Sequence, residues 1–112
     1  MADFKFGNDQ CAKRLSGTAN YLSILTRNLH IARQQGRLIV RHLLLPGHLE
    51  CCFKPAVRWL LENLPDVDFS LREGYLPSWR SGQFVELGRP LGRVDVAAAH
   101  DFLRDSPLKV IQ

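Results

Sequence analysis

The 112-residue chain contains no long apolar run. Its longest uncharged apolar stretch, at about residues 43–49, is interrupted by a Pro-Gly-His sequence, whereas a membrane-spanning helix needs about 20 apolar residues in succession. A secretion signal is not recognisable either, because charged residues occur within the first nine positions, where its apolar segment would lie. We therefore predict a cytoplasmic protein without membrane contacts.

Cysteine is scarce, and the chain contains only Cys11, Cys51 and Cys52. An odd number without a secretion signal indicates reduced thiols, and adjacent cysteines rarely form a disulfide because its geometry is strained. His42 and His48 are close enough in sequence to complete a zinc or iron ligand set with the cysteine pair. Structural zinc sites, however, usually combine two closely spaced ligand pairs, and no second pair is present. We therefore predict no metal ligands and expect small buried thiols.

A nucleophilic cysteine is a further alternative for the same residues. His48 could activate Cys51 or Cys52, but such a pair needs a third residue that orients the histidine. The sequence identifies no such residue. Motifs that bind phosphate through glycine-rich loops are missing, as is the HExxH motif of zinc proteases.

Charge of one sign is not in large excess. The 15 Lys and Arg residues against 11 Asp and Glu residues give a formal net charge of +4. Nucleic-acid-binding domains usually collect basic residues on one face, whereas the basic residues between positions 27 and 41 are distributed over a predicted helix, a turn and a strand. Nucleic acid is therefore disfavoured as a partner. The contents of 46% hydrophobic and 23% charged residues are typical of a globular chain.

What the sequence does contain is an alternation of strands and helices. The segment LIVRHLLL at residues 38–45 is nearly all apolar, which is typical of a parallel strand covered on both faces. Alternating polar and apolar residues predict two further strands, and apolar residues at three- and four-residue spacing predict helices. The predicted strands lie near residues 3–6, 38–45 and 67–73, and the predicted helices near 9–16, 20–35, 55–64 and from Asp95 onward.

Strand starts about 30 residues apart, with helices between them, are typical of βα units with parallel strands. Three such units are too few to close a barrel of eight, and a three-stranded sheet by itself leaves two open edges. Because the first strand starts near residue 3, we expect residues 1–112 to form one partial α/β domain, the carboxyl-terminal part of a larger one. A loop-rich segment is predicted at 74–94, and residues 108–111 are either a short strand or disordered.

Candidate binding residues lie on the first two predicted strands. Ligands of open α/β sheets and βα barrels bind at the carboxyl ends of the strands, where Lys5 is found. Arg41 is a polar residue within an apolar strand, and a buried arginine is costly unless it meets an anion or a carboxylate. Together the two side chains could hold a carboxylate, or a ribose and phosphate group. Alternatively, Arg41 simply reaches the surface, since it points to the opposite side of the strand from His42.

Several segments together resemble the carboxyl-terminal half of radical S-adenosylmethionine proteins, in the branch related to pyruvate formate-lyase activating enzymes. These segments are DFKFGND at 3–9, CAKRLSG at 11–17, RHLLLPGH at 41–48 and DFSLREGYLP at 68–77. The resemblance implies a partial (βα)6 barrel in which the three predicted strands are units four to six. It also implies a 4Fe–4S cluster that cleaves S-adenosylmethionine reductively, and a 5′-deoxyadenosyl radical that abstracts hydrogen from a substrate.

The same resemblance implies the residues of the cofactor site. Asp3 and Lys5 match a D-hydrophobic-K motif that contacts S-adenosylmethionine, and Arg41 matches a basic residue of the fifth strand. The CxxxCxxC motif that binds the cluster does not occur, so we expect no cofactor and no radical chemistry in this chain alone. It would be a truncated or split member whose partner is an amino-terminal half with the cluster motif. The alternative is a self-standing α/β interaction module that dimerises through an open strand edge.

Overall fold

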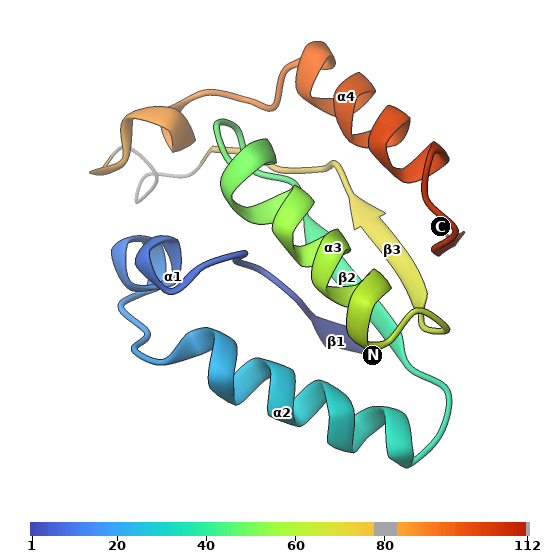
Figure 1. Ribbon diagram of the computed structural model, residues 1–112. Coiled ribbons are helices and arrows are strands. Elements are labelled where there is room, and N and C mark those ends of the chain that lie inside the picture. The colour runs from blue at the N-terminus through green and yellow to red at the C-terminus, as the bar shows by residue number, and fades with distance from the viewer. Residues whose placement is uncertain (78–82, 112) are drawn as a thin grey trace.

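The structure is a computed structural model that describes residues 1–77 and 83–111, and it has an α/β fold (Figure 1). Its four-stranded sheet has the order β1-β2-β3-β4, and every neighbouring pair of strands is parallel. The strands are β1 (Ala2–Asp3), β2 (Ile39–Leu43), β3 (Asp68–Arg72) and β4 (Lys109–Ile111). The predicted parallel α/β arrangement is confirmed. The three predicted strands are shorter than expected, and the carboxyl-terminal segment forms the fourth.

Four α-helices connect or precede these strands, and a π-helical turn, η1 (Leu49–Phe53), leads directly into the third helix. The helices are α1 (Asp9–Ser16), α2 (Tyr21–Gln34), α3 (Lys54–Asn63) and α4 (Arg93–Arg104). Of the predicted 74–94 loop segment, residues 78–82 lie outside the described residues, and a short 3-10 helix, η3 (Val85–Gly88), follows them. Within the described residues, no helix is long and apolar enough to cross a bilayer.

Helix α1 has strong signals at both ends. The side-chain oxygen of Asn8 accepts a hydrogen bond from the backbone N–H of Cys11 at 2.7 Å, which satisfies a donor that the first turn leaves free. The helix ends at Gly17, whose φ of 73° lies in the left-handed region that favours glycine. Asn8 and Gly17 therefore fix the two ends of α1, and the cap at Asn8 places Cys11 in the first turn of the helix.

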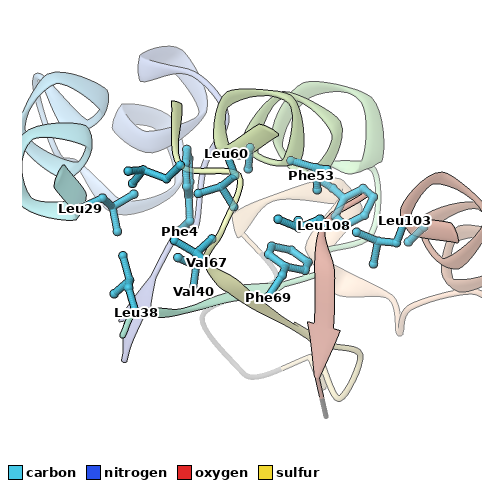
Figure 2. Packing of buried hydrophobic residues seen from close by; sticks show 14 of the residues in the cluster. Phe4, Leu29, Leu38, Val40, Phe53, Leu60, Val67, Phe69, Leu103 and Leu108 are labelled. Atoms are coloured by element: carbon cyan, nitrogen blue, oxygen red, sulfur yellow. The ribbon is translucent and has the colours of Figure 1, made fainter. Parts of the chain in front are cut away.

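One face of the sheet carries the hydrophobic core. Val40 is in register with Ala2 and Phe69, so alternate residues of neighbouring strands point to the same side. The buried side chains on this side pack against residues from three helices (Figure 2). The core includes Phe4, Val40 and Phe69 from the sheet segments, Leu29 from α2, Leu60 from α3 and Leu103 from α4. Helices α2, α3 and α4 therefore cover the same face.

The opposite side of the sheet is polar. Asp3 is in register with Arg41, and Arg41 with Ser70, so the three side chains form a row across β1, β2 and β3. Lys5 and Arg72 lie two residues further along the chain and point to the same side. We call these five residues the polar sheet face. Asp3, Lys5 and Arg41 of this face are the residues predicted above to bind a ligand, and Arg72 joins them in the structure.

Candidate functional site

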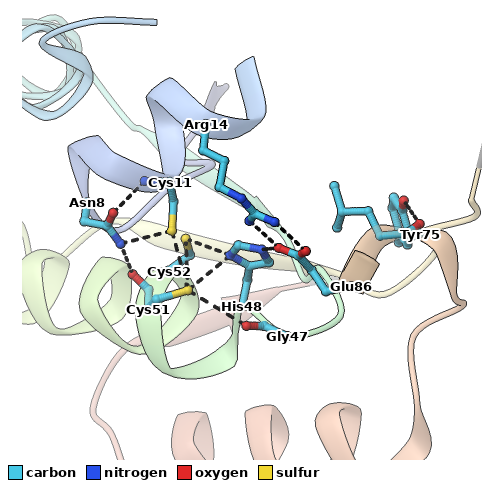
Figure 3. A network of polar contacts seen from close by, with 10 residues as sticks. Asn8, Cys11, Arg14, Gly47, His48, Cys51, Cys52, Tyr75 and Glu86 are labelled. Atoms are coloured by element: carbon cyan, nitrogen blue, oxygen red, sulfur yellow. Dashed lines mark hydrogen bonds and ion pairs between the residues drawn. The ribbon is translucent and has the colours of Figure 1, made fainter. Parts of the chain in front are cut away.

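Two loops at the carboxyl edge of the sheet bring three cysteines and a histidine together. Cys11 lies in the first turn of α1, which follows β1, while His48, Cys51 and Cys52 lie in the loop and π-helical turn after β2 (Figure 3). Gly47, with a φ of 77°, reverses the chain just before His48. Because carboxyl ends of neighbouring parallel strands meet at one edge, residues 40 positions apart become neighbours. We call Cys11, His48, Cys51 and Cys52 the Cys–His site.

The four ligand atoms of the Cys–His site all lie within 4.8 Å of one another. The Sγ atom of Cys51 is 3.7 Å from the Sγ atoms of Cys11 and Cys52. The Nδ1 atom of His48 lies 3.1 Å from the Sγ atom of Cys51 and 3.6 Å from that of Cys52. The three cysteines are free thiols. Three sulfurs and one imidazole nitrogen therefore surround a common point.

The other ring nitrogen of His48 is held by an acidic residue. Nε2 lies 2.8 Å from Oε2 of Glu86, and Arg14 binds both carboxylate oxygens of Glu86 at 2.5 and 2.7 Å. The hydrogen bonds from Arg14 lower the pKa of Glu86 well below its usual range, so the carboxylate is ionised and accepts a hydrogen bond from Nε2–H of His48. This contact fixes the ring with Nδ1 facing the sulfurs of Cys51 and Cys52.

The thiols are partly shielded from solvent. His48 and Cys52 are 3% and 1% exposed, whereas Cys11 and Cys51 are half-buried. Burial raises the pKa of Cys51 and of Cys52, although a backbone hydrogen bond from Gly7 acts in the opposite direction on Cys52. For Cys51 and Cys52, desolvation therefore favours the protonated thiol over the thiolate.

Gly7 and Asn8 fit closely around the turn that carries Cys51 and Cys52. A Cβ atom on Gly7 would lie 2.7 Å from the carbonyl oxygens of both cysteines, so the close approach of the two loops requires glycine. The side-chain amide of Asn8 donates to the carbonyl of Cys51 at 2.8 Å and to the Sγ atom of Cys11 at 3.4 Å. The loop after β1 therefore packs closely against the turn after β2.

His42, which the sequence suggested as a companion of the cysteine pair, is not in the Cys–His site. Its side chain is 2% exposed and points into the core, where its ring lies 5.6 Å from that of Phe53. Nδ1 lies 2.6 Å from the carbonyl oxygen of Phe4, to which the neutral ring donates. Burial lowers the pKa of His42 to about 4. Its role is therefore to link β2 to the chain after β1.

The polar sheet face contains the other candidate residues, and it brings them together. Asp3, Lys5, Arg41 and Arg72 line one cavity of about 280 Å³ with Leu43. Nε of Arg41 donates to Oδ1 of Asp3 at 2.7 Å, and this bond lowers the pKa of Asp3, with smaller contributions from Lys5 and Arg72. Three cations around one carboxylate leave the cavity positively charged.

A larger cavity of about 790 Å³ adjoins the first one, with which it shares Leu43 and Arg72. It lies at the carboxyl ends of β2, β3 and β4, where the Glu73 carboxylate and the His100 ring of α4 are within hydrogen-bond distance of each other. The Oγ atom of Ser70, on the polar sheet face, is buried and has no hydrogen-bond partner among the described residues. The polar sheet face therefore borders one cavity, adjoins a second, and contains one buried hydroxyl without a partner among the described residues.

The sequence pointed to His48, Cys51 and Cys52 as possible metal ligands, although no metal site was predicted. It did not point to Cys11 or Glu86 as their companions. The signal for Cys11 was available, because it follows the first strand as closely as the cysteine pair follows the second, and such loops meet at one sheet edge. Glu86 gave no such signal, since it belongs to a segment without apolar periodicity. It is the third residue that orients His48.

The three thiolates do not fit a 4Fe–4S cluster. In such a cluster each cysteine binds a different iron, which requires a wider separation than sulfurs that share one ion. The Sγ atom of Cys51 lies 3.7 Å from each of the other two sulfurs, and all three lie within 4.8 Å of one another, which matches the second case. No step of the radical chemistry is therefore assigned to these cysteines.

Comparison with known proteins gives one informative match. The chain is 31% identical over 111 residues, which is 99% of its length, to a protein of Methanocaldococcus jannaschii described as uncharacterized. It spans about a third of that relative, since the match covers 32% of the longer chain. The sequence matches no protein-family model, and no solved structure matches the chain.

Proposed function

We propose that the chain forms three βα units of a partial barrel of the radical S-adenosylmethionine type and that its polar sheet face binds S-adenosylmethionine. The strand order β1-β2-β3-β4 supports the barrel. Doubly wound sheets reverse their strand order and carry helices on both faces, whereas consecutive order with helices on one face is the arrangement of a βα barrel. In such a barrel the polar sheet face would line the interior.

The single observation that carries this function is the shared cavity of Asp3, Lys5 and Arg41. These residues come from two segments 36 or more positions apart. They lie on one face of the sheet, with Asp3 at the end of β1, Lys5 just beyond it and Arg41 in the middle of β2. A guanidinium and an ammonium suit the methionine carboxylate of the cofactor, and a carboxylate suits ribose hydroxyls. The adjoining larger cavity would leave room for a substrate.

The iron–sulfur cluster of such an enzyme would be bound outside these residues. The relative from Methanocaldococcus jannaschii is about three times as long as the matched region, which is consistent with a barrel of which this chain supplies one part. An amino-terminal half, on the same or another chain, would then carry the cluster motif. When bound, the cluster supplies the electron that cleaves S-adenosylmethionine, and the residues of this chain hold and orient the cofactor.

The sequence predicted no cofactor in this chain alone, but because Asp3, Lys5 and Arg41 line one cavity without any other chain, we now expect the chain to bind S-adenosylmethionine without the cluster. Calorimetric titration of the chain with S-adenosylmethionine and with 5′-methylthioadenosine tests the proposal, because only the first ligand has the carboxylate. We expect tighter binding of S-adenosylmethionine. Arg41→Ala should remove a charge-assisted hydrogen bond and weaken its binding roughly 10- to 100-fold, with little effect on 5′-methylthioadenosine. Arg27→Ala, which removes an exposed cation from α2, is the matched control. Equal affinities for both ligands, or equal effects of the two variants, would contradict the proposal.

The alternative function is an interaction module that dimerises through a strand edge. It is favoured by the two outer strands of the sheet, of which the first, β1, is the edge predicted from the sequence and the other is β4, since an open edge can pair with another strand. Sedimentation equilibrium distinguishes the two functions. A stable homodimer that does not bind S-adenosylmethionine favours the module, and a monomer that binds the cofactor favours the barrel.

A further inference from the structure

We propose that Cys11, His48, Cys51 and Cys52 bind one zinc ion in a tetrahedral Cys3His site that fastens the loop after β1 to the turn after β2. This site differs from the cofactor site above in residues, location and chemistry. It lies at the junction of α1, the π-helical turn and the 85–88 segment, and not on the polar sheet face. Its existence does not depend on the proposed function.

Four of the six distances between the ligand atoms are close to those around a single zinc ion, and the other two, from Cys11 to Cys52 and from Cys11 to His48, are within 4.8 Å. With Zn–S bonds of about 2.3 Å and Zn–N bonds of about 2.0 Å, tetrahedral geometry separates two sulfurs by about 3.8 Å and a sulfur from a nitrogen by about 3.5 Å. The Sγ atom of Cys51 is 3.7 Å from each of the other two sulfurs, and the distances from Nδ1 of His48 to two sulfurs are 3.1 and 3.6 Å. Small adjustments would thus suffice for coordination.

The residues that surround the four ligands also suit a metal ion. Histidine ligands of zinc usually donate their other ring N–H to a carboxylate, which fixes the ring and raises its basicity. Glu86 accepts this hydrogen bond from His48, and Arg14 holds Glu86 through both oxygens. The amide of Asn8 points at the sulfur of Cys11, where its N–H can stabilise a thiolate.

Two competing roles explain the arrangement less completely. A Cys–His–Glu catalytic triad would need one thiol beside His48, and it gives no reason for a second and a third sulfur within 4.8 Å. A redox disulfide would use two thiols and would leave His48 and its carboxylate without a role. One zinc ion uses all four ligands and the orienting carboxylate.

The choice of ion follows from the ligands. Three thiolates and one imidazole make a soft, four-coordinate donor set that suits zinc, and the stability order places Zn²⁺ above Fe²⁺ for the same ligands. Because all four positions come from protein, the site is closed, as in structural rather than catalytic zinc centres. Binding replaces the protons of three thiols by one Zn²⁺, so three protons are released for each ion bound when the thiols start protonated.

Metal titration of the reduced, chelator-stripped 112-residue chain tests the proposal. Zn²⁺ is titrated in competition with a chromophoric chelator, and Co²⁺ is titrated separately because its tetrahedral thiolate complexes absorb strongly in the visible range. We expect one equivalent of either ion, a tetrahedral Co²⁺ spectrum and displacement of Co²⁺ by Zn²⁺. Zinc should also protect the three thiols from alkylation, as read by mass spectrometry.

Variants assign the site to its residues. Cys11→Ser should weaken zinc binding by more than about 100-fold, and Glu86→Gln by about 10- to 100-fold, the range found for outer-shell partners. His100→Gln, which changes an exposed histidine of α4, should bind zinc as the wild type does. Circular dichroism of the metal-free variants establishes that each is folded.

Three results would overturn the zinc site. They are less than stoichiometric zinc binding by the folded wild type, an octahedral Co²⁺ spectrum, and unchanged zinc affinity in folded Cys11→Ser. Failure of the zinc site can be told apart from failure of the proposed function, because the two are measured with different ligands that contact different residues. Arg41→Ala should weaken the binding of S-adenosylmethionine and leave zinc binding unchanged.

Discussion

Acidification should destabilise this fold through His42, and the magnitude follows from the burial of that side chain. The ring is 2% exposed and donates from Nδ1 to the carbonyl oxygen of Phe4. Burial lowers its pKa from 6.5 to about 4, because the charged imidazolium is poorly solvated inside the core. The folded protein therefore keeps His42 neutral at pH values at which the unfolded chain protonates it.

The direction of the pH effect follows from this difference in proton binding. Between pH 6.5 and about 4 the unfolded state binds a proton at His42 that the folded state does not, so the free energy of unfolding falls as the pH is lowered through this window. At about 1.4 kcal/mol for each pH unit, the loss reaches about 3 kcal/mol at pH 4. Above pH 7 the ring is neutral in both states and adds no slope.

Urea denaturation between pH 4 and 7.5, followed by circular dichroism in the presence of a chelator, measures this contribution. In His42→Gln the titrating ring is missing, so lowering the pH from 7 to 4 should change the stability difference by about 3 kcal/mol in favour of the variant. His30→Gln replaces an exposed histidine of α2 and should follow the wild-type curve. Carboxylates contribute equally to all three proteins. Parallel curves for wild type and His42→Gln would refute the buried, neutral ring.

Three further substitutions test the packing around the two loops and the core. Gly7→Ala places a Cβ 2.7 Å from two carbonyl oxygens and should cost about 1–3 kcal/mol, whereas Gly74→Ala meets open space; equal melting temperatures would contradict the close approach. Phe53→Ala removes a fully buried ring and should lower the free energy of unfolding in urea by about 3–5 kcal/mol; a loss below about 1 kcal/mol would contradict its packing. Asn8→Ala removes the cap of α1 and should cost about 1 kcal/mol, most of which Asn8→Ser should restore; equal losses would argue against a capping role.

The alternation of strands and helices was predictable because its signals are local. The apolar segment at 38–45 contains the observed strand Ile39–Leu43, and the helix predicted at 20–35 is Tyr21–Gln34. The ends of strands were less predictable, because they depend on where a partner stops pairing. Residues 3–6 were predicted as a strand, yet β1 ends at Asp3. Beyond it Phe6 leaves the sheet and packs with Ala12 and Cys52.

The polar sheet face was partly predictable. Strand periodicity places Asp3 and Lys5 on one side of their strand, and Arg41 on the side away from His42. That these sides coincide depends on the register of β1 against β2, which pairs Asp3 with Arg41. A shift of that register by one residue would have turned one set toward the core, so the cavity needed the tertiary structure.

The sequence by itself determined the order of the first three strands and their helices, the parallel direction of those strands and their polar sides, because these depend on spacing between near neighbours. Only the tertiary structure decided that Cys11 lies beside Cys51, that Glu86 orients His48 and that His42 belongs to the core. Each of these contacts joins segments 38 to 40 residues apart. Such contacts depend on how βα units pack and on the path of the loops, which hydrophobic periodicity does not encode.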